Sequence, residues 1–144
     1  MPDPQNPDFT LVFRPAEIEP FSRGSGVATI PLVGHWSSDL STVTTGMTVF
    51  PPGTSIPLHT HNVEETVLVL RGQATAELGD RTVDLEAGEV TWVAPGVTHR
   101  FVNRGSDEMA IYWVYAGRFV SRTTAATGRT VVHLSDADRG ASGS

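Results

Sequence analysis

Two histidines and a glutamate stand close together in the segment PPGTSIPLHTHNVEETVLVLRG. His59 and His61 are two residues apart, so on a β-strand their side chains point to the same face. Asn62 and Val63 can form a turn, which would bring Glu65 onto a neighbouring strand. There its carboxylate could reach an ion that the two imidazoles hold. The spacing therefore indicates a metal site.

A further donor must come from elsewhere in the chain, and His99 is the best placed. It follows a Pro-Gly turn in APGVT and opens a predicted strand. Three imidazoles and one carboxylate suit Zn, Fe, Mn, Ni, Co or Cu, with positions left open for water or substrate. The sequence therefore predicts one divalent transition metal per chain, held by His59, His61, Glu65 and His99, with several metals still possible.

The elements that must position these residues are short strands. Runs rich in valine, threonine and aromatic residues recur between glycine and proline breaks, which is typical of an all-β sandwich or barrel. The predicted strands cover residues 10–13, 27–33, 44–50, 66–70, 74–78, 81–85, 89–93, 99–103, 109–115 and 130–134. Gly79-Asp80 predicts a tight hairpin turn. We expect one domain over residues 9–135, with flexible ends at 1–8 and 136–144.

Composition excludes several classes of function. The net charge of -6 leaves no basic patch, so we expect no nucleic-acid partner. Cysteine is absent, which excludes disulfides and thiol chemistry, and all ten basic residues are arginine, which excludes Schiff-base chemistry on lysine. No apolar run is long enough to span a membrane, and the first residues do not resemble a signal peptide. We therefore expect a cytoplasmic protein without a membrane partner.

The residues around the predicted metal site resemble the two motifs of the cupin superfamily. The first motif has glycine, five residues, His-x-His, three or four residues, glutamate, six residues and glycine. The second has glycine, five residues, Pro-x-Gly, two residues, histidine, three residues and asparagine. The chain matches them with Gly53, His59, His61, Glu65, Gly72, Gly88, Gly96, His99 and Asn103. Ala94 replaces the proline of the second motif, and Pro95 follows one place later, a departure that concerns turn geometry rather than the ligands.

The resemblance implies a cupin jelly-roll β-barrel, also called a double-stranded β-helix, with the metal inside one end. It covers residues 45–115 well and gives the ligand roles to His59, His61, Glu65 and His99. Glu64 falls outside the ligand position, and Asn103 is expected to be structural. A cupin barrel by itself says little about the reaction.

The strands next to the ligands predict an apolar, aromatic wall. Along residues 109–115 either Tyr112 and Val114 or the alternate set with Ile111 faces inward. No arginine falls at a predicted inward position, so a cation to clamp an anionic substrate is not expected. The predicted substrate-binding residues are Val67, Val69, Trp92, Phe101, Trp113 and Tyr115. This wall favours a small apolar or aromatic, polyketide-like substrate.

Three functions remain open. The first is metal-assisted enolisation and ring closure, as in polyketide cyclases of antibiotic biosynthesis, with His35 as the catalytic base. The second is a dioxygenase that acts on an enol or catechol. The third is a ligand-binding cupin without turnover. His133, near the predicted tail, is expected to be an ordinary surface or hydrogen-bonded histidine.

Two predicted strands are apolar on both faces. TVLVL and MAIYWVY lack the alternation of a strand that has one face in water. Either the N-terminal segment or another copy of the chain must cover the second face, so a homodimer is expected.

Overall fold

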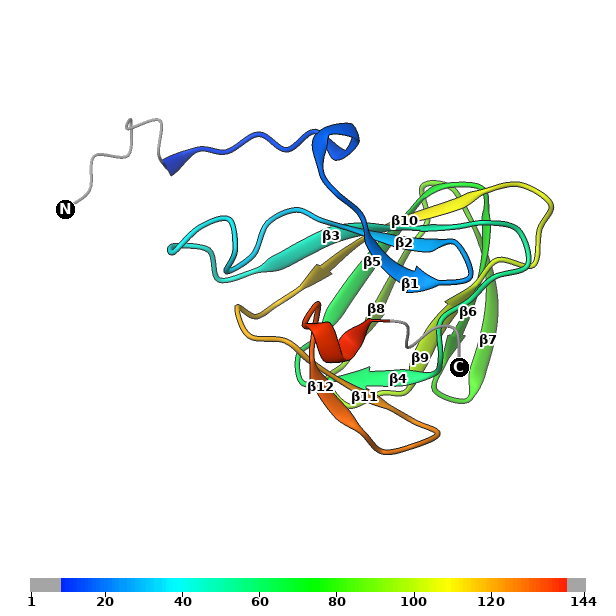
Figure 1. Cartoon of the computed structure of the whole chain (residues 1–144). Helices are drawn as coiled ribbons and strands as arrows, with labels where there is room; N and C mark the ends of the chain where they lie inside the picture. Colours follow the sequence, from blue (N-terminus) through cyan, green and yellow to red (C-terminus); the bar gives the residue numbers. More distant parts are fainter. Residues whose placement is uncertain (1–8, 140–144) are drawn as a thin grey trace.

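The computed structural model describes residues 9–139. Across these residues the chain forms two antiparallel six-stranded sheets and two short 3-10 turns, η2 (Pro15–Glu17) and η3 (Asp136–Asp138), which confirms the all-β class (Figure 1). None of its helical segments is long and apolar enough to cross a membrane.

The first sheet has the order β1-β2-β3-β10-β5-β8. Its strands are β1 (Phe21–Gly24), β2 (Val27–Pro31), β3 (Thr44–Phe50), β5 (Glu65–Arg71), β8 (Val90–Val93) and β10 (Met109–Tyr115). The second sheet has the order β12-β11-β4-β9-β6-β7. Its strands are β4 (His59–His61), β6 (Gln73–Leu78), β7 (Arg81–Glu86), β9 (His99–Val102), β11 (Ser121–Thr124) and β12 (Thr130–Val132).

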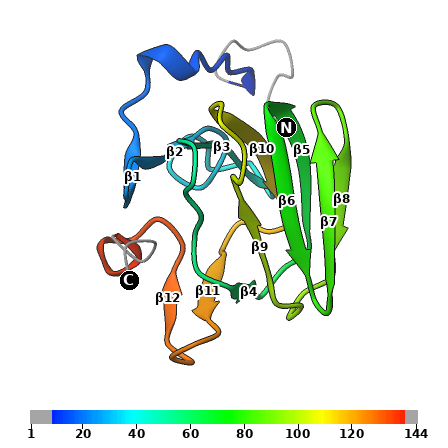
Figure 2. The ribbon, with the colours of Figure 1, turned by 90° about the vertical axis from the view of Figure 1, so that its right-hand side faces the viewer.

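The two sheets lie against each other and enclose one apolar core, in the manner of a jelly roll (Figure 2). Inward positions on both sheets supply large apolar side chains, because alternate residues of a strand face the core. The core includes Val27, Phe50, Val67, Val69, Phe101, Met109, Ile111 and Trp113. The site described below lies at one end of this core.

Most predicted strands are present, including the hairpin at Gly79-Asp80, across which Leu78 pairs with Arg81. The prediction of a strand at residues 10–13 is wrong: no strand forms there, and the segment is mostly exposed. Strands β1 and β11 were not predicted. Both are polar, and the side chains they bury include arginines, so they lack the apolar alternation on which the prediction depended.

Of the two predicted flexible ends, residues 1–8 lie wholly outside the described residues, and the C-terminal end lies outside them at 140–144. Residues 136–139 of the predicted tail are described, and η3 lies among them. Asp138 is completely buried there, so this part of the tail packs against the barrel.

Candidate metal centre

The four predicted ligands come from both sheets. His59 and His61 lie on β4, and His99 opens β9, the next strand of the same sheet, directly opposite His59. After His61 the chain bends and crosses to the first sheet, where Glu65 begins β5. The crossing sets the carboxylate against the imidazoles, as the predicted turn required.

The donor atoms converge in a buried space. The ligand nitrogens of the three histidines lie within 4.8 Å of one another. The carboxylate of Glu65 approaches two of them, with Oε1 3.2 Å from His99 Nε2 and Oε2 3.8 Å from His61 Nε2. All four side chains are buried. Asn103 lies outside this group, and its amide hydrogen-bonds the carbonyls of Phe50 and Asp107.

Each of the three imidazoles is held in one tautomer. His59 Nδ1 lies 2.8 Å from the Pro57 carbonyl, His61 Nδ1 3.0 Å from that of Ser121, and His99 Nδ1 2.8 Å from that of Val97. A carbonyl oxygen can only accept, so each Nδ1 carries the proton and donates. The Nε2 lone pairs are therefore left free, which is the arrangement typical of metal-ligating histidines.

Apart from the approach of Glu65, the Nε2 atoms of His61 and His99 have no polar partner in the part of the chain that the structure describes. Both atoms are fully buried. Buried polar atoms are rarely left unpaired in proteins. A divalent ion at this point would satisfy both lone pairs and the carboxylate, so the donor set fits the predicted cofactor, one divalent transition metal per chain.

The electrostatics favour the ligand forms of His59, His61 and Glu65. The raised pKa of His99 instead favours its protonated form while no ion is bound. Burial, followed by the positive charge of Arg122, holds the pKa of His59 well below its usual value. Burial also lowers the pKa of His61 to about 4, although Glu65 opposes the shift. Burial alone would lower the pKa of His99, but the adjacent Glu65 raises it overall. Burial alone would raise the pKa of Glu65, but the neighbouring histidines lower it.

The donors face a small cavity of about 30 Å³. Ile111, Trp113 and Tyr115 line it, so these alternate residues of β10 face inward rather than Tyr112 and Val114. Its other lining residues are Arg23, Thr29, Thr48, Ile56, His59, His61, Glu65, His99, Phe101, Arg122 and His133.

The predicted substrate-binding residues therefore divide into three groups. Phe101, Trp113 and Tyr115 line the cavity. Val67 and Val69 lie in the core behind it. Trp92 is 61% exposed on the outer side of the first sheet, where its indole hydrogen-bonds the exposed Glu64. Its position on β8 puts it on the face opposite the core.

Two arginines at the cavity correct the expectation that none would face inward. Arg23 on β1 and Arg122 on β11 are 3% and 2% exposed. Both contact Asp138 of η3: Arg23 Nη1 lies 2.6 Å from its Oδ2, and Arg122 Nη1 lies 3.5 Å from its Oδ1. No local pattern in the sequence indicates this cluster, because its members approach one another only through the sheet pairing and the C-terminal turn.

His133 also belongs to the site, against the expectation of an ordinary histidine. Its ring lies 5.9 Å from that of His61 and 5.1 Å from that of Tyr115. Burial, together with the charge of Arg23, holds the pKa of His133 well below its usual value, so the imidazole is neutral at pH 7. It lines both the metal cavity and a second, outer pocket.

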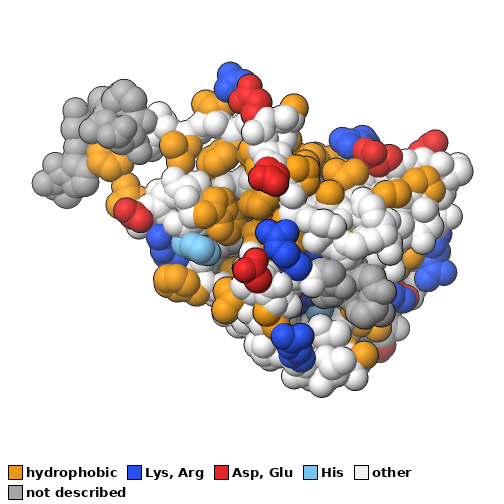
Figure 3. Space-filling view, viewed as in Figure 1, with side chains coloured by type: hydrophobic (Ala, Val, Ile, Leu, Met, Phe, Trp, Pro, Cys, Tyr) orange, Lys and Arg blue, Asp and Glu red, His pale blue; other side chains and the backbone are white. Residues whose placement is uncertain are grey.

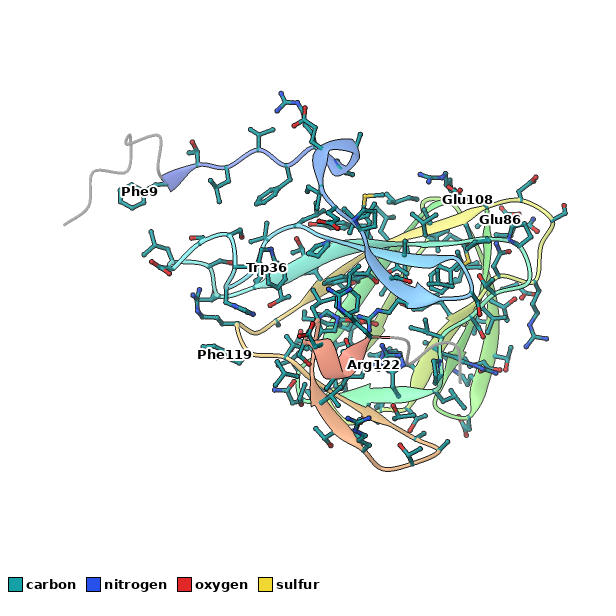
Figure 4. All side chains as sticks on the ribbon, in the orientation of Figure 1. Phe9, Trp36, Glu86, Glu108, Phe119 and Arg122 are labelled. Atoms are coloured by element: carbon teal, nitrogen blue, oxygen red, sulfur yellow. The ribbon has the colours of Figure 1, made fainter. Side chains whose placement is uncertain are left out.

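The outer pocket has a volume of about 200 Å³ and contains the predicted base, His35. His35 is exposed and does not line the metal cavity; its ring lies 5.2 Å from Trp36 and 6.4 Å from Phe119. Hydrophobic side chains gather around an exposed histidine on this face of the molecule (Figure 3). Figure 4 shows Trp36 and Phe119 at the outer edge of the fold and Arg122 close to η3. His133 stands between the two spaces.

Comparison with known proteins supports the cupin assignment. Residues 46–115 match the family model of the cupin domain. No curated protein sequence matches the chain. A solved structure of Bacillus subtilis oxalate decarboxylase, an S161A mutant, is similar with a TM-score of 0.70 and 19% identity, over 78% of this chain and 31% of that one.

Two further structures are similar in the same way. Lactobacillus farciminis oxalate decarboxylase in a formate complex gives a TM-score of 0.69 at 18% identity, over 76% of this chain and 34% of that one. A structure of the Bacillus subtilis enzyme, solved in work on its Mn(II) centres, gives a TM-score of 0.71 at 20% identity, over 78% of this chain and 31% of that one. The chain thus spans about a third of the length of these proteins. Residues 46–115 thus match the cupin-domain family model, and the chain shares the fold of these solved structures.

Proposed function

We propose that this chain is a metal-dependent cupin enzyme that acts on an oxygen-rich substrate with an apolar or aromatic body. The observation that carries the proposal is the fixed tautomer of three clustered histidines, two of which turn their Nε2 atoms toward the buried carboxylate of Glu65. When bound, a divalent ion supplies Lewis-acid stabilisation to an enolate oxygen. The Mn(II) centres named for Bacillus subtilis oxalate decarboxylase make Mn(II) one of the ions to test.

The finer proposal is enolisation followed by ring closure, as in a polyketide cyclase. The outer pocket beside His35, Trp36 and Phe119 suits the apolar body of a substrate whose oxygen atoms reach past His133 toward the metal cavity. His35 and His133 both line that pocket, and we assign the role of base that accepts a proton from carbon to the exposed His35.

Tyr115 is a hydrogen-bond donor in this scheme. Burial and the nearby Glu65 raise the pKa of Tyr115 well above its usual value, so the phenol keeps its proton at neutral pH. Its side chain lines the metal cavity, where it can donate a hydrogen bond to a substrate oxygen. The neutral imidazole of His133, which also lines the cavity, can accept a hydrogen bond from the substrate.

The alternatives are a dioxygenase on an enol or catechol and a binding protein without turnover. Proton exchange at carbon separates the three. We would incubate Zn-loaded protein anaerobically with 2,4-pentanedione in D₂O and follow loss of the C3 proton by NMR. Faster exchange than in buffer, abolished in His59→Ala, supports the cyclase-type reaction.

Other results select the alternatives. Exchange at the buffer rate, together with O₂ consumption by the Fe-loaded protein, would replace the proposal with a dioxygenase. A ligand that binds without exchange or O₂ consumption would favour the binding protein.

A further inference from the structure

We propose that Arg122 is a binding site for the carboxylate of a small ligand inside the metal cavity, and that it binds through the Nε–H and Nη2–H edge of its guanidinium. The proposal deepens the proposed function and rests on it in one respect, that the same cavity receives the substrate. It changes the expected substrate class from wholly apolar to an acid that carries a second oxygen next to its carboxylate.

Arg122 has unused donors where a ligand could reach them. It pairs with His61 across β11 and β4 and lines the metal cavity. The residue is 2% exposed, yet its Nε and Nη2 atoms have no hydrogen-bond partner among the described residues. Unpaired buried donors are rare, and those of a charged group are the most costly. An occupant of the cavity would pair them.

The rest of the guanidinium is already held in place. Asp138 lies 3.5 Å from Nη1, on the side away from the free edge. The same carboxylate contacts Arg23, whose Nε donates to Thr29, and accepts the backbone N–H of Leu134 at 2.9 Å. Asp138 thus restrains Arg122 without using its Nε/Nη2 edge. That edge matches the two oxygens of a carboxylate, which arginine binds in bidentate fashion.

The charges around the cavity also favour an anion. The two guanidiniums of Arg23 and Arg122 balance the two carboxylates of Glu65 and Asp138. A divalent ion would therefore leave two uncompensated positive charges in a buried space, and burying unpaired charge is unfavourable. A carboxylate bound between the ion site and Arg122 reduces that excess. The 30 Å³ volume limits the group to a small one.

Glycolate and hydroxyacetone form a matched pair of probes, because they differ mainly in replacing a carboxylate with a neutral methyl ketone. We would titrate each into metal-free and into Zn-loaded protein, measuring affinity by calorimetry and the Arg122 Nε–H signal by ¹⁵N NMR. Glycolate should bind more tightly than hydroxyacetone and shift that signal. Arg122→Gln should weaken glycolate binding roughly tenfold to a hundredfold, as loss of a charged hydrogen-bonding group does.

Two variants guard against a folding defect. Arg122→Gln/Asp138→Asn removes one buried charge of each sign and should lose glycolate binding to the same extent. Arg71→Gln, which removes a half-exposed arginine paired with Glu108, should bind glycolate as the wild type does. Three results would overturn the proposal. Glycolate could bind Arg122→Gln and the double variant with wild-type affinity, it could bind the wild type no better than hydroxyacetone does, or it could fail to bind the wild type both with and without metal.

Metal content, measured on the same samples, separates this inference from the proposed function. If the chain retains no metal but glycolate still binds metal-free protein through Arg122, the proposed function fails and the carboxylate site stands. If metal binds and the arginine variants leave glycolate affinity unchanged, the carboxylate site fails alone.

Discussion

Single residues decide whether the site can hold an ion, and His61 shows this most clearly. Its Nδ1 is committed to the Ser121 carbonyl, so only Nε2 remains as a ligand atom. We expect His61→Ala to weaken Zn²⁺ binding by more than the roughly 10- to 100-fold that loss of a ligand's hydrogen-bond partner costs. Elemental analysis after dialysis should show bound metal falling from about one ion per chain to near none.

His35→Ala is the matched control for His61→Ala. It also removes an imidazole, but from the exposed outer pocket rather than from the metal cavity. Its metal content should equal that of the wild type. Equal metal content in His61→Ala and wild-type protein would show that the ligand assignment is wrong.

The histidine pKa values predict how stability depends on pH in the metal-free chain. His61 has a pKa of about 4 when folded, against the ordinary histidine value of 6.5 in the unfolded chain, and the pKa values of His59 and His133 are lowered in the same direction. The unfolded state therefore binds protons first, and stability falls as pH drops from 6.5 toward 4. His99, whose pKa is raised, is the one described histidine with a resolved shift that opposes this loss of stability.

Urea denaturation at pH 6.5 and pH 4.5 measures this dependence. Each pKa unit corresponds to about 1.4 kcal/mol, and only part of the His61 shift is expressed between these two pH values. His61 alone therefore accounts for a loss of about 2 kcal/mol in the free energy of unfolding. An unfolding midpoint that stays constant or rises on acidification would contradict the buried, neutral state of these imidazoles.

The sequence predicts some of these residues and not others, for a physical reason. His59, His61 and Glu65 lie within seven positions of one another, so strand periodicity and one turn are enough to group them. Arg23 and Asp138 are separated by 115 positions, and only the complete fold brings them together. The same holds for His133, which reaches the metal cavity through the course of β11 and β12.

At the scale of elements, the short turn η3 stabilises the end of the barrel through one side chain. Asp138 is completely buried between Arg23 and Arg122. Asp138→Ala would leave two guanidiniums buried without their shared partner, and breaking a buried pair in this way costs about 3–5 kcal/mol. We expect a lower unfolding midpoint in urea and faster amide exchange at Leu134.

Asp136→Ala provides the comparison within the same turn. The Asp136 side chain is fully exposed, so its loss should leave the midpoint unchanged. If Asp138→Ala also unfolds at the wild-type midpoint, η3 does not anchor the C-terminal segment.

Strand prediction succeeded where the inward residues are apolar and failed where they are charged. Strands such as β5 and β10 carry uninterrupted valine, leucine and aromatic residues, and both were predicted. β1 and β11 bury Arg23 and Arg122, so binary patterning gives no signal for them. Residues 10–13 have the composition of a strand, but no strand forms there.

At the scale of the whole molecule, the first sheet presents an apolar outer face. Leu70, Val90 and Trp92 are 38%, 60% and 61% exposed on the adjacent strands β5 and β8, and β8 is the edge of the sheet. In the described part of the N-terminal segment, Leu11 and Val12 are themselves exposed. We propose that a second copy of the chain covers this face, in a homodimer through β5 and β8.

Trp92→Glu tests this dimer, because a two-fold contact would place the two introduced carboxylates near each other in an apolar interface. Light scattering after gel filtration should give the mass of a dimer for the wild type and of a monomer for Trp92→Glu. Leu40→Glu adds the same charge at a loop position that is 63% exposed and should remain a dimer. Near-UV circular dichroism of both variants checks that the fold is intact. A monomeric wild type, or a Trp92→Glu variant that stays dimeric, would contradict the dimer. The exposed apolar face would then have to serve another contact, because burying Trp92 away from water is favourable.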